Sequence, residues 1–131
     1  MKQVIIDTNA LIAIATFKID IFEQIAQCLD VEYQLCIVQG TIKELEKLKI
    51  DSKLSGKDKV AAKLALSIIQ QKIANKKIIV LSGDPNTDVD TTLTNYSKFG
   101  ALVLTQDKGL KIRLTKPYLT IRQKKRVVLI Q

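Results

Sequence analysis

The chain has 131 residues, with 21 Lys and Arg against 13 Asp and Glu, and a formal net charge of +8. This length suits one domain spanning residues 1–131, and 47% hydrophobic but only 5% aromatic residues predict an aliphatic core. No apolar stretch approaches the roughly 20 residues of a membrane span. An acid also ends the first short apolar run, which argues against a signal peptide, so we expect a cytoplasmic protein.

The positive charge is concentrated at one end of the chain. Basic and acidic residues balance over residues 1–107, whereas residues 108–131 hold no acid. A field of one sign attracts polyanions, so this basic C-terminal segment predicts contact with the RNA backbone, although a solvated surface rich in Lys is the simpler alternative. The candidate RNA-binding side chains are Lys108, Lys111, Arg113, Arg122, Lys124, Lys125 and Arg126.

In chain order, short apolar runs alternate with helical patterns. The first half predicts strands at 4–6 and 35–38, and helices over 10–15, 19–29 and 40–48. The second half predicts a long helix over about 57–74, a strand at 78–81, a helix over 88–98, a strand at 101–104, a helix over 108–114 and short strands at 118–121 and 127–130. Strands that are apolar throughout are typical of a parallel sheet covered on both faces.

The fold class predicted by this order is α/β, a three-layer α/β/α arrangement with a central, mainly parallel sheet. The long helix places Val60, Leu64 and Ile68 on one apolar stripe and Ala61 beside it. Burial in the core explains this stripe, and a dimer face explains it equally well.

Four acidic residues follow predicted strands: Asp7, Glu44, Asp90 and Asp107. Asp7 comes directly after the first strand, and Asp107 stands three residues after the fourth. Ligands of open parallel sheets bind beyond the carboxyl ends of the strands, so these side chains have reason to face one crevice.

Packed carboxylates repel one another unless a cation neutralises them, and oxygen ligands without His favour Mg²⁺ or Mn²⁺ over zinc. Each acid also has a structural alternative: Asp7, Asp90 and Asp107 could cap helices, and Glu44 could pair with Lys47.

The segment Val4-Ile5-Ile6-Asp7-Thr8-Asn9 resembles the opening of PIN-domain nucleases. Three further elements resemble that family in the same order, namely Thr41-Ile42-Lys43-Glu44-Leu45, Asp88-Val89-Asp90-Thr91-Thr92-Leu93 and Thr105-Gln106-Asp107-Lys108. Together they run over most of the chain, from residue 4 to residue 108.

The resemblance implies a PIN-like fold and an Mg²⁺- or Mn²⁺-dependent endoribonuclease. Asp7, Glu44, Asp90 and Asp107 would be the ligands, supported by Asn9 and Thr105. One departure matters: Val89 separates two acids that are often adjacent in the family, so Asp88 is an auxiliary ligand or, in another register, the third ligand. Within the family, the sequence most resembles archaeal and eukaryotic PIN proteins that process ribosomal RNA. Toxin-type PIN ribonucleases are the alternative subgroup.

A second hypothesis is a non-catalytic RNA-binding or scaffold PIN domain within a larger complex. A phosphatase or receiver domain fits less well, because position 9 is Asn and Leu81 is followed by Ser82. The expected partner is RNA, with a homodimer or a partner protein as further alternatives and no membrane.

Overall fold

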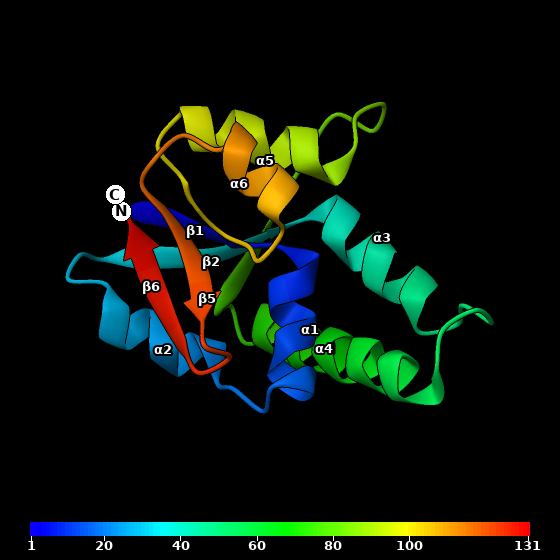
Figure 1. The fold of residues 1–131 in the computed structure, drawn as a ribbon. Helices are drawn as coiled ribbons and strands as arrows, with labels where there is room; N and C mark the ends of the chain where they lie inside the picture. Colours follow the sequence, from blue (N-terminus) through cyan, green and yellow to red (C-terminus); the bar gives the residue numbers. More distant parts are fainter.

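The computed structural model describes all of residues 1–131, and its centre is one six-stranded sheet (Figure 1). The strands are β1 (Lys2–Ile6), β2 (Tyr33–Val38), β3 (Ile78–Leu81), β4 (Leu102–Leu104), β5 (Tyr118–Arg122) and β6 (Arg126–Ile130). Their order is β3-β2-β1-β4-β5-β6, and every neighbouring pair is parallel except β5 and β6. The predicted mainly parallel sheet is therefore confirmed.

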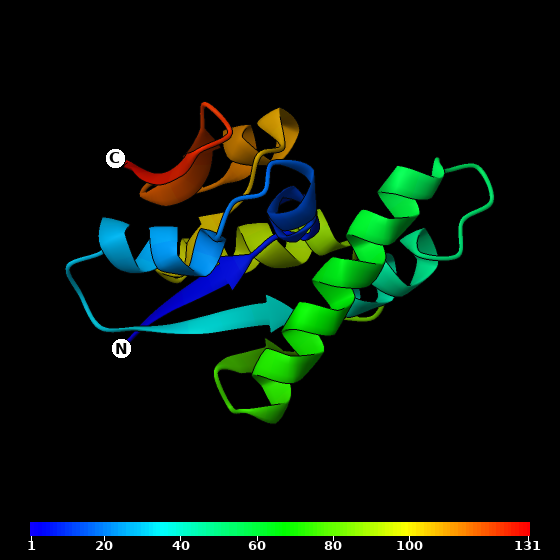
Figure 2. The same ribbon diagram turned by 90° about the horizontal axis from the view of Figure 1, so that it is seen from below.

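Helices cover both faces of this sheet. They are α1 (Thr8–Thr16), α2 (Ile21–Cys28), α3 (Gln39–Leu48), α4 (Gly56–Ala74), α5 (Val89–Lys98) and α6 (Lys108–Arg113). In Figures 1 and 2, α5 and α6 lie on one face, while α1, α2 and α4 lie on the other. The three-layer prediction is confirmed, and the observed ends of the elements lie within two residues of most predicted ones.

Alternation along the strands explains how one sheet supports two apolar layers. Val4 and Ile6 belong to the cluster beneath α1 and α4, whereas Ile5 belongs to the cluster beneath α5 and α6. Successive side chains of a strand point to opposite faces, so a strand covered on both sides must be apolar at every position. All three of these residues are fully buried.

The long helix α4 corrects one expectation. Its buried face consists of Ala61, Ala62, Ala65, Leu66 and Ile69. Small alanine side chains let α4 pack closely against α1 and α3. Val60 and Leu64 are therefore turned outward, with exposed fractions of 65% and 44%. Of the two explanations of the apolar stripe, burial in the core fails for these two residues, and the dimer face stays a prediction.

The parallel strands end along one edge of the sheet, which we call the carboxyl edge. The residues that follow β1 and β4 meet there, because Ile6 pairs with Leu104. The helices α3 and α5 begin at this edge, after β2 and the loop following β3. No helix in the structure is both long and apolar enough to cross a membrane.

Candidate active site

The four acids singled out from the sequence line one cavity at the carboxyl edge. This acidic cavity has a volume of about 250 Å³ and is lined by Asp7, Thr8, Asn9, Ile12, Glu44, Leu48, Asp90 and Asp107. No Lys or Arg is among its lining residues. Four carboxylates from four separate parts of the chain thus share a pocket without a basic side chain between them.

Asp7 is the buried member of the set, with 5% of its surface exposed. One carboxylate oxygen accepts the backbone N–H of Thr8 at 2.8 Å, which caps α1. The other oxygen accepts the hydroxyl of Thr105 at 2.7 Å. Asp7 therefore both caps α1 and lines the acidic cavity.

Thr105 and Asn9 join the ends of β1 and β4. While it donates to Asp7, the Thr105 hydroxyl accepts the backbone N–H of Asp107 at 3.1 Å. The side-chain oxygen of Asn9 accepts the backbone N–H of Gln106 at 3.1 Å. Asp107 in turn caps α6 by accepting the N–H of Gly109 at 2.9 Å. These bonds hold Asp7 and Asp107 in a fixed relation.

The two neighbouring acids of α5 occupy different places. Asp88 is exposed and caps the helix by accepting the N–H of Thr91 at 2.8 Å. Asp90 is half-buried and lines the acidic cavity, which Asp88 does not. The capping role considered for Asp90 thus belongs to Asp88.

The cavity disfavours the ionised form of Asp7, Glu44 and Asp90. Burial is the main cause that raises the pKa of Asp7, and the charges of Asp90 and Asp107 add to it, while the bond from Thr105 opposes it. Burial also raises the pKa of Glu44, with Asp7 and Asp90 adding to the effect. The pKa of Asp90 is raised by burial and by Asp107 and Asp88, against the opposing charge of Arg113.

The donor set suits a hard cation, since every polar group lining the cavity presents oxygen and none is His or Cys. Thr8 adds a buried hydroxyl that lacks a hydrogen-bond partner of ordinary geometry, although it lies near enough to lower the pKa of Glu44. No three acidic side chains converge closely enough here to form a complete ligand set. The cavity therefore gathers the acids without fixing a coordination geometry.

The basic side chains predicted to bind RNA lie in two groups. Arg113 on α6 donates to the Thr91 hydroxyl at 2.9 Å, beside the acidic cavity. The basic hairpin, residues 122–126, joins β5 to β6 at the carboxyl edge. Partial burial and the charges of Lys108 and Arg122 lower the pKa of Lys111, which places these three side chains in one positive field.

Sequence reasoning missed three lining residues of the acidic cavity, namely Thr8, Ile12 and Leu48. Thr8 could have been predicted from its position between Asp7 and Asn9 in the motif. Ile12 and Leu48 follow Thr8 and Glu44 by one helical turn, so they could be predicted only after the helices had been placed.

Known proteins resemble this chain over nearly its full length. A family model described as a PIN like domain matches residues 4–124. Ribonuclease VapC4 of Methanocaldococcus jannaschii is 33% identical over 130 residues, covering 95% of this chain and 94% of the relative. Ribonuclease VapC9 of Archaeoglobus fulgidus is 28% identical over 113 residues, covering 85% and 74%.

Solved structures agree with these matches. The PIN domain endonuclease Utp24 superposes with a TM-score of 0.76 at 28% identity, covering 97% of this chain and 90% of that one. A domain of a functionally unknown protein from Methanocaldococcus jannaschii shares the fold at a TM-score of 0.56 and 16% identity, covering 86% and 84%. Motif order, strand order and these matches lead to one conclusion: the chain belongs to the PIN-domain nuclease family.

Proposed function

We propose that this protein is an Mg²⁺- or Mn²⁺-dependent endoribonuclease that hydrolyses RNA phosphodiesters at the acidic cavity. The observation that carries the proposal is the gathering of Asp7, Glu44, Asp90 and Asp107 around one cavity that no basic side chain lines. Gathering carboxylates around one cavity, with Asp7 buried, is unfavourable without a counter-charge, and a divalent cation would provide one. The named ribonucleases among its relatives support the reaction class.

In this proposal Asp7, Asp90 and Asp107 would hold the cation, with Asp88 outside the ligand set. When bound there, the cation would supply Lewis-acid activation of water and neutralise charge on the phosphate. Glu44 orients the attacking water and accepts its proton on a carboxylate oxygen, a task suited to a carboxylate whose pKa is raised. Thr105 and Asn9 keep Asp7 and Asp107 in register.

The basic side chains would grip the RNA backbone on either side of the cut. Lys108, Lys111 and Arg113 on α6 lie between the acidic cavity and the basic hairpin in the chain. Contacts of Lys and Arg to phosphates set affinity and position but do not read sequence. We therefore assign these side chains to binding the RNA backbone and not to recognising the RNA sequence.

The test is a cleavage assay with purified protein and a fluorescent RNA, with Mg²⁺, with Mn²⁺ and with excess chelator. We expect cleavage that requires the cation and that Asp7→Asn abolishes while the circular-dichroism spectrum is unchanged. Full activity of Asp7→Asn in a clean preparation would remove Asp7 from the site. Tight RNA binding without cleavage under any divalent ion would instead favour the non-catalytic scaffold hypothesis.

The class of RNA forms a finer proposal. The basic segment around Arg122–Arg126 supports a role in ribosomal RNA processing, whereas the two VapC relatives support the toxin-type alternative. Mapping the ends produced from total cellular RNA separates the two. Cuts confined to precursor ribosomal RNA would support the first, and cuts in transfer or messenger RNA the second.

A further inference from the structure

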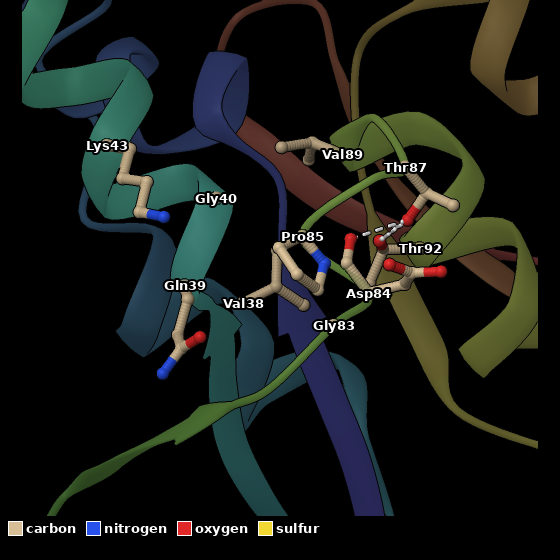
Figure 3. Close-up of a pocket in the computed structure, with 10 residues that line it drawn as sticks. All are labelled: Val38, Gln39, Gly40, Lys43, Gly83, Asp84, Pro85, Thr87, Val89 and Thr92. Atoms are coloured by element: carbon tan, nitrogen blue, oxygen red, sulfur yellow. Dashed lines mark hydrogen bonds between the residues drawn. The ribbon is translucent and has the colours of Figure 1, made fainter.

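A second cavity has no lining residue in common with the acidic cavity and has no role in the proposed chemistry. It has a volume of about 210 Å³ and lies between the start of α3 and the loop from β3 to α5 (Figure 3). Gln39, Gly40 and Lys43 form its wall on α3, and Gly83, Pro85 and Val89 lie on the loop side. We call it the glycine-lined cavity.

The two cavities share the same two structural elements. Lys43 lines the glycine-lined cavity and the next residue, Glu44, lines the acidic cavity. Val89 and Asp90 are divided in the same way on α5. Because consecutive residues of α3 and of α5 line the two cavities, a nucleotide next to one whose phosphate lies among the acids would have the glycine-lined cavity nearby.

Two glycines allow the walls to approach this closely. A Cβ atom on Gly40 would lie 2.6 Å from Cγ2 of Val89, and one on Gly83 would lie 2.9 Å from Cγ2 of Thr92. Neither glycine has a positive φ, so backbone conformation does not demand glycine at either position. Glycine is less favourable than alanine in a helix, and Gly40 lies in the first turn of α3. The close packing of α3 against α5 explains why residue 40 has no side chain.

Hydrogen bonds within the loop and to α5 hold the loop wall in place. The Asp84 carboxylate accepts the N–H of Asn86 at 2.8 Å, and the Asp84 carbonyl accepts the hydroxyl of Thr87 at 2.9 Å. The Tyr96 hydroxyl donates to the Ser82 carbonyl at 2.7 Å, which ties the start of the loop to α5. A wall fixed in this way binds with little loss of conformational entropy.

The chemistry of the walls fits a nucleobase. Pro85 and Val89 offer apolar surface on one side, and on the other the side chains of Gln39 and Lys43 have no hydrogen bond to any residue drawn in Figure 3. An amide presents a donor and an acceptor together, which is the pair that reads the edge of a base. The volume lies below the range of drug-sized pockets and suits one base rather than two.

We propose that the glycine-lined cavity holds one unpaired base of the RNA strand next to the scissile phosphate, and that Gln39 reads its edge. This inference rests on the proposed ribonuclease function and deepens it by making the substrate a single-stranded segment with a base preference. Proteins commonly read RNA sequence from unstacked bases in this way. Lys43 then contacts the phosphate of the same nucleotide.

The first test is cleavage of a randomised RNA library with Mn²⁺, followed by sequencing of the product ends. We expect wild-type protein to prefer one base at a fixed position beside the cut, and Gln39→Ala to lower that preference about tenfold. Lys43→Ala should weaken cleavage without altering the preference. Gln70→Ala and Lys63→Ala, exposed positions on α4, are the matched controls and should change neither.

The second test measures binding of short RNA oligonucleotides by fluorescence anisotropy without divalent ions. Replacing the preferred base by an abasic nucleotide should weaken binding to wild type but not to Gln39→Ala. Base-dependent binding that is lost in Gln39→Ala, together with no cleavage of the library in Mg²⁺ or Mn²⁺, would overturn the proposed hydrolysis and support the base subsite alone. Cleavage or binding with no base preference, or a preference unchanged in Gln39→Ala, would overturn the subsite.

Discussion

The acidic cavity and the basic hairpin lie on the same edge of the sheet but are built in different ways. In the cavity, Asp7 is buried and fixed by two hydrogen bonds of 2.8 and 2.7 Å. In the hairpin, residues 122–126 are exposed, and Lys124 has the ring of Phe17 as a neighbour at 5.4 Å. Catalysis needs acids held in a defined relation, whereas attraction of a polyanion needs only positive charge within reach.

The largest difference in activity should be between two Asp→Asn variants that lie only two residues apart at the start of α5. Asp90→Asn removes a carboxylate from the acidic cavity and should lower kcat more than about a hundredfold, beyond the loss typical of supporting residues. Asp88→Asn keeps a good helix cap at an exposed position and should leave kcat near that of wild type. The check is kcat of both variants at saturating Mn²⁺. Equal losses would place Asp88 in the site as well.

A smaller loss should follow from cutting the link between β1 and β4. Thr105→Val removes the hydroxyl that donates to Asp7 and accepts from Asp107, so we expect a loss of roughly 10- to 100-fold in activity or cation affinity. Activity titrated against Mn²⁺ concentration measures both. Thr120→Val is the control, because Thr120 is also a buried threonine, on β5, and its hydroxyl has no partner. A similar loss in Thr120→Val would mean that the effect is general destabilisation.

The basic hairpin should affect affinity rather than the chemical step. Replacing Lys124 and Lys125 by Ala should weaken RNA binding several-fold at low salt and reduce the slope of log K against log salt by roughly 0.7 for each lost contact to a single strand. The same replacement at Lys76 and Lys77, just before β3, removes equal charge from the amino end of a strand and is the control. Binding isotherms at four salt concentrations give the slopes. An unchanged slope in the hairpin variant would remove these lysines from the RNA interface.

The smallest effect concerns stability without divalent ions. Because burial raises the pKa of Glu44 above its ordinary 4.5, the folded state keeps this proton to a higher pH than the unfolded chain. The resulting stabilisation is complete below the unfolded pKa and is lost as the pH rises through the folded pKa. Glu44→Gln resembles the protonated form and should raise Tm at pH 8 but hardly at pH 3.

Thermal unfolding followed by circular dichroism measures this difference. Glu46→Gln, an exposed position on the same helix, should move Tm little at either pH. If Glu44→Gln has a lower Tm than wild type at pH 8, the ionised Glu44 carboxylate stabilises the folded protein, and the prediction is wrong.

Much of the fold could be predicted because local and tertiary preferences agree. Val4, Ile5 and Ile6 are apolar at consecutive positions, and this pattern demands a strand covered on both faces, as observed. The exit of β1 at Asp7 and the order of the later acids predicted which residues would meet at the carboxyl edge. Their roles in catalysis and in holding a cation stay predictions.

Other features could not be predicted from periodicity. Val60 and Leu64 have the spacing of a core stripe, yet they are exposed because the neighbouring alanines allow closer packing against α1 and α3. Sequence spacing gives the faces of a helix but not which face finds a partner. The glycine-lined cavity could not be predicted for a related reason. The need for glycine at positions 40 and 83 is visible only once Val89 and Thr92 have been placed beside them.

The sequence by itself determined the alternation of strands and helices, the segregation of positive charge after residue 107 and the presence of four acids after strands. These properties depend on residue type and on spacing within single elements. The tertiary structure decided that Asp90 rather than Asp88 enters the acidic cavity, and that the hydroxyl of Thr105 joins Asp7 to Asp107. Such choices depend on how separate elements pack against one another, which no local pattern specifies.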